Sequence, residues 1–184
     1  MKYTKFADIP EFTRGGNYRV NVGWNFLEKH LEHWNEPRRN SPLVLDPDFQ
    51  RAHVWTEEKQ IKYVEYVLRN GQSSRNIYFN CSSWQQEYNT PVELVDGKQR
   101  LEAVRAFLRN EIPAFNSFFK EYTDRLRMGN GCDFVFHVNN LKTRKEVLQW
   151  YLDLNEGGVV HTTAELNKVK KLLELELKPS KLEI

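Results

Sequence analysis

The chain of 184 residues contains only two cysteines, Cys81 and Cys132, and no C-x-x-C pair. Two cysteines cannot form a disulfide framework, and the missing pair removes the usual spacing of a zinc site. No apolar stretch is long enough to cross a bilayer, and the first residues lack the apolar core of a secretion signal. We therefore expect a cytoplasmic protein that makes no membrane contact and keeps both cysteines as reduced thiols.

An excess of charge of one sign is also missing. The 27 basic and 25 acidic residues leave a net charge of +2 and a pI of about 8.5. A dedicated DNA-coating protein is far more basic, so this class is excluded, although one or two arginines would suffice for a local phosphate site. Aromatic residues make up 13% of the chain and hydrophobic residues 40%, which predicts an ordered core and excludes a disordered chain.

Neither an internal repeat nor a Pro/Gly/Ser-rich linker divides the chain, so residues 1–184 are predicted to form a single domain with a frayed tail over about 178–184. Apolar periodicity predicts strands at 18–22, 43–45, 76–81, 92–95 and 133–138. It predicts helices over 24–34, between Thr56 and a stop at Gly71, and directly after Asp96, Thr143 and Thr162. The predicted fold class is α+β, with a small mixed sheet packed against several helices.

The most informative stretch is VELVDGKQRLEAVRAF, over residues 92–107. A strand of buried type ends in Asp96-Gly97, and a helix begins at once. One interpretation is an ordinary capping box, in which Asp96 caps the helix and Gln99 returns the bond. Under that interpretation a side chain at position 97 would be harmless, so the glycine suggests that another group approaches the backbone closely.

The first turn of this helix carries two cations, Lys98 and Arg100. The helix dipole disfavours positive charge there by about 0.3–1 kcal/mol each, a cost that a bound anion would offset. A phosphate fits this position, because it would meet backbone N–H groups, the positive helix end and an arginine that can donate two parallel hydrogen bonds. The pattern therefore favours a phosphate-binding turn as the alternative to the capping box.

A second stretch, DPDFQRAHVW, places Gln50 and Arg51 in a loop just before a capped helix. Considered alone, it is a polar loop anchored by Trp55.

A third stretch, LNEGGVVHTTAEL, places Asn155, Gly157 and Gly158 at the joint between two helices. Considered alone, it is a helix end with glycine near its C-cap.

The three motifs together, Q-R-x-x-x-W, D-G-x-Q-R-L and N-x-G-G-x-x-x-x-x-x-E-L, resemble the N-terminal domain of GmrSD-type restriction endonucleases. The resemblance covers about Trp24 to Leu173. It implies a ParB/sulfiredoxin-like fold and a nucleotide-binding, nucleotide-hydrolysing module in defence against foreign or modified DNA, such as that of phages. The family signature D-G-Q-Q-R matches positions 96–100, where Lys98 replaces the first glutamine and bears on the nucleotide preference.

The hypothesis that follows is an NTPase whose nucleoside triphosphate lies over the turn. Asp96 would hold Mg²⁺ or orient a water, and Arg100 would grip phosphate oxygens. Arg51 would supply a second cation for charge that develops in phosphoryl transfer, and Gln99 belongs to the same catalytic set. By match to the family motifs, the residues expected to bind the nucleotide are Gly97, Lys98, Gln50, Asn155, Gly157 and Gly158.

Two alternatives to the NTPase remain open at this stage. One is a non-catalytic module that binds DNA or a protein partner, with Trp84 and Tyr88 stacking on exposed bases. Another is a metal-dependent DNA nuclease that uses Asp96 with Asp46 and Asp48, although two-metal cleavage needs several converging acids. Relatives that cut DNA often carry a separate H-N-H nuclease domain, so a nuclease subunit could be a partner. Sulfinic acid reduction is not expected, because Lys98 stands where sulfiredoxins carry their nucleophilic cysteine.

Overall fold

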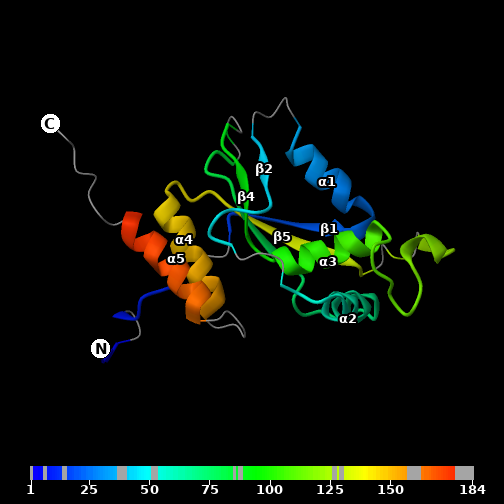
Figure 1. Ribbon diagram of the computed structural model, residues 1–184. Coiled ribbons are helices and arrows are strands. Elements are labelled where there is room, and N and C mark those ends of the chain that lie inside the picture. Colours follow the sequence, from blue (N-terminus) through cyan, green and yellow to red (C-terminus); the bar gives the residue numbers. More distant parts are fainter. Residues whose placement is uncertain are drawn as a thin grey trace.

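A computed structural model describes residues 2–5, 8–13, 16–36, 41–50, 54–84, 86, 89–125, 128, 131–156 and 163–176 (Figure 1). Its helices and strands follow one another in the order β1 (Tyr18–Gly23), the 3-10 turn η2 (Trp24–Phe26), α1 (Leu27–Trp34), β2 (Leu43–Val44), α2 (Glu57–Leu68), β3 (Asn76–Asn80), β4 (Val92–Asp96), α3 (Lys98–Leu108), the 3-10 turn η4 (Phe119–Glu121), β5 (Asp133–Asn139), α4 (Arg144–Glu156) and α5 (Thr163–Glu176).

The five strands form one sheet in the order β1-β5-β3-β4-β2. β1 runs antiparallel to β5, β5 parallel to β3, β3 antiparallel to β4, and β4 parallel to β2. The predicted fold class, α+β with a small mixed sheet and several helices, is therefore confirmed. The single domain and the ParB/sulfiredoxin-like fold stay predictions.

Side chains on the two faces of the sheet belong to two separate hydrophobic clusters. Ile77 and Phe79 of β3 lie in the first cluster with the apolar faces of α1, α2 and α3. The intervening Tyr78 packs against the second cluster, which Val95 of β4 forms with Phe49, α4 and α5. This alternation is what a strand with both faces covered requires. In Figure 1, α4 and α5 lie side by side, apart from α1, α2 and α3.

Helix α2 begins as predicted but ends differently. The side chain of Thr56 accepts a hydrogen bond from the N–H of Lys59 at 3.3 Å. At the other end Asn70 adopts φ +65°, and the N–H of Gly71 donates to the carbonyl of Tyr66. Asparagine tolerates this left-handed conformation, so Asn70 ends the helix and the prediction for Gly71 is wrong. Gly71 is needed for another reason, because a Cβ there would lie 2.3 Å from the Tyr66 ring.

The capping box predicted before α4 is present. The N–H of Thr143 donates to the carboxylate of Glu146 at 2.9 Å, and the N–H of Glu146 donates to the hydroxyl of Thr143 at 3.2 Å. The second predicted box begins at Thr162, which lies outside the described residues, as does the tail from residue 177.

Both cysteines are free thiols, as predicted, and the structure shows that both are buried. None of the helices in the described part of the chain combines the length and the apolar character that crossing a bilayer requires.

Candidate functional site

The turn between β4 and α3 depends on Gly97, which adopts φ +106° and is the N-cap residue of α3. A Cβ at this position would lie 2.5 Å from Cδ1 of Ile77 and 3.3 Å from Nη2 of Arg100. The group that approaches the backbone, as the sequence suggested, is therefore the neighbouring strand β3 together with Arg100. Backbone conformation and packing both exclude a side chain here.

The capping box between Asp96 and Gln99 does not form. The N-cap residue is Gly97, and no side chain of the described residues caps the first turn of α3. The carboxylate of Asp96 instead accepts a hydrogen bond from Nη2 of Arg100 at 2.5 Å. The helix therefore begins without the ordinary side-chain cap that the first interpretation required.

Both cations of the first turn are paired with carboxylates of the chain itself. Lys98 forms an ion pair with Asp46, and its side chain is 11% exposed against 75% for Asp46. Arg100 and Asp96 are both about three-quarters buried, and Nε of Arg100 has no hydrogen-bond partner among the described residues. These two pairs offset the unfavourable helix dipole, and the Arg100 guanidinium keeps an unused donor.

Two buried glutamines tie the second motif to the turn. Gln99 accepts hydrogen bonds from the N–H groups of Val54 (2.9 Å) and Trp55 (3.1 Å). Gln50 donates from Nε2 to the carbonyl of Leu94 in β4 at 2.6 Å. The segments on either side of residues 51–53 are thus fixed to the strand and the helix that form the turn.

These contacts assign structural roles to two predicted site residues. The amides of Gln50 and Gln99 are both engaged with backbone groups, and each residue is less than a tenth exposed. Arg51, the predicted second cation, lies outside the described residues.

The third motif reaches the same region through α4. Asn155 lies inside this helix and not in the loop after it, and its Nδ2 donates to the carbonyl of Tyr151 at 2.6 Å. Tyr151 in turn makes an edge contact with Phe49, the residue before Gln50, at a centroid distance of 5.4 Å. Asn155 is buried, and its hydrogen bond to the carbonyl of Tyr151 lies within the helix, so this contact stabilises α4. Gly157 and Gly158 lie outside the described residues.

Tyr78 is a neighbour of the turn that the sequence did not single out. A register shift in the β3–β4 pair places Tyr78 opposite Asp96, while Phe79 pairs with Leu94. Burial raises the pKa of the Tyr78 phenol, and the negative charge of Asp96 raises it further. The only signal in the sequence is the alternation of β3, which puts Tyr78 on the face opposite Ile77 and Phe79.

A row of side chains continues from Tyr78 across the sheet. Tyr78 stacks on His137 of β5 at a centroid distance of 4.7 Å, and His137 lies opposite Arg19 of β1. Burial lowers the pKa of His137, and the positive charge of Arg19 lowers it further. The row therefore places Tyr78 beside Asp96 and Arg19 at its far end, with strands β5 and β3 between Arg19 and Asp96.

The acids of the second motif do not converge with Asp96. Asp46 is paired with Lys98, whereas Asp48 is paired with Arg144 of α4 at 2.5 Å. In the part of the chain that the structure describes, no three His, Cys, Asp or Glu side chains form a potential metal site. The geometry of the described residues therefore gives the nuclease alternative no cluster of acids.

Trp84 is not available for stacking on bases. Its side chain is 8% exposed and packs against Trp34 and Tyr18 in the first cluster. The prediction that Trp84 stacks on bases is therefore wrong. The residues next to Trp84 in the sequence are polar and indicate an exposed loop, whereas its burial comes from Tyr18 and Trp34, which are distant in the sequence. Its intended companion Tyr88 lies outside the described residues.

An open hollow of about 510 Å³ begins beside Lys98 and runs along the solvent side of α3. Acidic residues outnumber basic ones, three to two, in its lining, which consists of Leu45, Asp46, Gln60, Lys98, Glu102, Ala106, Arg109 and Glu111.

The family model of the GmrSD restriction endonuclease N-terminal domain matches residues 31–134, more than half of the chain. The chain belongs to this family. The matched region contains the Q-R-x-x-x-W and D-G-x-Q-R-L motifs, whereas the third motif lies beyond it, so the match is shorter than the resemblance suggested. Membership suggests a role in DNA restriction. Neither the curated proteins nor the solved structures compared with the chain gave a match.

Proposed function

We propose that this GmrSD-type domain binds a nucleoside triphosphate over the turn of residues 96–100 and hydrolyses it in the service of DNA restriction. The observation that carries the proposal is the N-terminus of α3, which has Gly97 in a left-handed conformation and no side-chain cap from the described residues. An uncapped helix N-terminus offers backbone N–H groups and positive potential to a phosphate.

Arg100 is the side chain best placed to assist. Its Nη2 is bonded to Asp96, while its Nε lacks a partner among the described residues. A phosphate that accepted from the guanidinium would satisfy this donor and would compete with Asp96 for the cation. Arg51 is proposed as the second cation, on the strength of the family motif alone.

Asp96 is the proposed magnesium ligand. Mg²⁺ is commonly held by one or two carboxylates together with phosphate oxygens and waters, so a single acid beside the phosphate fits this ion. The metal would supply charge neutralisation for the phosphate oxygens. If Arg100 turns toward phosphate, the carboxylate of Asp96 becomes free to coordinate.

Isothermal titration with ATP, GTP and CTP in the presence of magnesium tests the proposal. We expect one of them to bind the parent protein and Arg100→Ala to lose about tenfold or more in affinity, because charge-assisted hydrogen bonds contribute about 1.5–3 kcal/mol.

Arg105→Ala is the matched control. It removes another arginine of α3, one that is paired with Glu28 and Glu102 and lies away from the turn. Arg105→Ala should bind the nucleotide as tightly as the parent protein does. Hydrolysis, measured as release of inorganic phosphate from the triphosphate, should require Asp96. If Arg100→Ala binds every nucleotide as tightly as the parent, the turn is not the phosphate site.

A further inference from the structure

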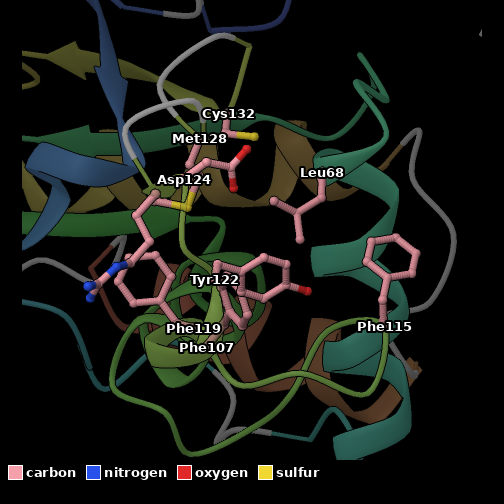
Figure 2. A pocket seen from close by; sticks show the side chains of 9 residues that line it. Leu68, Phe107, Phe115, Phe119, Tyr122, Asp124, Met128 and Cys132 are labelled. Atoms are coloured by element: carbon pink, nitrogen blue, oxygen red, sulfur yellow. The ribbon is translucent and has the colours of Figure 1, made fainter.

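A cavity of about 300 Å³ lies at the other end of α3 from the turn. Figure 2 shows side chains from α2, α3 and the segment before β5 gathered around it. Most of the lining is apolar or aromatic, with two charged residues added, and consists of Leu68, Phe107, Phe115, Phe119, Tyr122, Asp124, Arg125, Met128 and Cys132. Its volume is at the lower end of small-molecule sites, which suits one flat ring with a substituent.

The aromatic wall is a connected cluster. Phe107 makes edge contacts with Phe119 at a centroid distance of 5.6 Å and with Tyr122 at 6.1 Å. Tyr122 is fixed by its hydroxyl, which donates to the carbonyl of Ala114 at 2.6 Å. The wall therefore holds its shape without a ligand and presents rings for stacking.

Phe115 stands at the rim in a conformation that its side chain disfavours. It and Asn116 have φ of +47° and +62° at the tip of a turn closed by two hydrogen bonds between Ala114 and Ser117. The N–H of Phe115 is held by Glu65 at 2.8 Å, and the ring remains 41% exposed. A bulky residue in the left-handed region marks strain, and such strain is concentrated at binding sites.

Two arginines lie on the rim aromatics. The guanidinium of Arg69 lies 5.1 Å from the Phe115 ring centre, and that of Arg125 lies 5.8 Å from the Phe119 ring centre. Neither forms an ion pair within the part of the chain that the structure describes. Two nearby acids are engaged elsewhere, since Glu65 of α2 and Glu121 of η4 accept hydrogen bonds from the N–H groups of Phe115 and Phe118. Two cations thus flank an aromatic cavity.

We propose that this cavity receives a nucleobase extruded from duplex DNA. An extruded base stacks on aromatic and apolar walls, while flanking phosphates meet arginines. The carboxylate of Asp124 would accept a hydrogen bond from an exocyclic amino group of the base. The inference goes beyond the proposed function, because triphosphate binding at the turn is neither needed for it nor measured in its test.

Fluorescence anisotropy with short labelled duplexes at low salt provides the test. A duplex with one central mismatch should bind about tenfold more tightly than the matched duplex, because the mismatched base is already partly unpaired. Phe115→Ala should remove this preference. Phe12→Ala is the control, since Phe12 is an exposed aromatic (63%) next to Thr13, which is bonded to Asp153 of α4, away from the cavity.

The salt dependence of DNA affinity tests the role of Arg69 and Arg125. Arg69→Ala combined with Arg125→Ala should reduce the slope of log K against log salt by about 2, because each phosphate contact contributes about 0.9. Arg19→Ala, an exposed arginine of β1, should leave the slope unchanged.

Crosslinking keeps the proposal testable even if a variant is unstable. A 5-iodouracil at the mismatch should crosslink, in the parent protein, to the peptide that contains residues 115–125. Equal affinity for matched and mismatched duplexes, a preference that survives Phe115→Ala, or free deoxynucleotides bound as tightly as DNA would each overturn the inference.

Discussion

Gly97 is constrained by its own backbone and by its neighbour at the same time. Its φ of +106° is costly for any residue with a Cβ, and the Cβ would overlap Ile77 at 2.5 Å. Neither constraint involves a ligand. The glycine therefore shapes the turn independently of any ligand.

Gly97→Ala is expected to lower the free energy of unfolding by about 3 kcal/mol, from left-handed strain and overpacking together. Urea denaturation measures the loss. Gly23→Ala is the matched control, because Gly23 has φ −62° and its Cβ would meet Phe26 only at 3.9 Å. A control that loses as much as Gly97→Ala would show that the overlap with Ile77 is not decisive.

Gln99→Leu is expected to cost about 2–4 kcal/mol, since the N–H groups of Val54 and Trp55 would both lose their acceptor. The same change at Gln149, an exposed residue of α4, should stay within about 0.5 kcal/mol. Thermal unfolding of the two variants makes the comparison. A Gln99→Leu protein as stable as the parent would mean that these bonds are dispensable.

At the scale of elements, β3 and β5 together carry the stacked pair of Tyr78 and His137, next to Arg19 of β1. Nε2 of His137 is also within 3.1 Å of the side-chain oxygen of Asn76, to which its N–H can donate. The low pKa of His137 follows from burial and from Arg19, so the neutral ring is the form that fits this row.

The lowered pKa predicts how stability depends on pH. The unfolded chain binds the His137 proton near the ordinary value of 6.5, whereas the folded protein binds it only at lower pH. The free energy of unfolding should therefore fall as pH drops below about 6.5. Denaturation at several values between pH 5 and 8 should show a flatter profile for His137→Gln than for the parent. Identical profiles would assign the pH dependence to other groups.

Element positions were largely predictable, because each strand and helix has an apolar period that depends only on nearby residues. Contacts between elements were not. Asn70 ends α2 where Gly71 was expected, and the partners of Gln99 lie more than 40 positions away. The position of Tyr78 beside Asp96 depends on a register shift between strands, for which a single sequence carries no signal.

At the scale of the whole molecule, the sheet separates two hydrophobic clusters. Trp34 is buried in the first and Trp150 in the second, where Trp150 makes an edge contact with Tyr78 at 5.9 Å. Strands β3 and β4 contribute side chains to both clusters. The packing of each cluster therefore depends on strands that the other cluster also holds in place.

If the chain is one domain, damage to the second cluster should spread to the first. Trp150→Ala is expected to cost about 3–5 kcal/mol. Trp150→Phe should cost less, because it keeps a ring in the cluster and leaves a smaller cavity, and because the indole N–H that both changes remove has no partner to lose among the described residues. Hydrogen exchange should show α4 and β5 losing protection together along a urea series. Two separate transitions would contradict the single-domain prediction.

Helix α3 joins the proposed triphosphate turn at Gly97 to the cavity wall at Phe107. With 11 residues, it spans roughly 16 Å, and its rigid rod keeps that separation whatever occupies either end. A helix of this length does not bend enough to move the turn without the cavity, or the cavity without the turn. A change sensed at one end therefore reaches the other only as a tilt, a shift along the axis or a rotation of the whole helix.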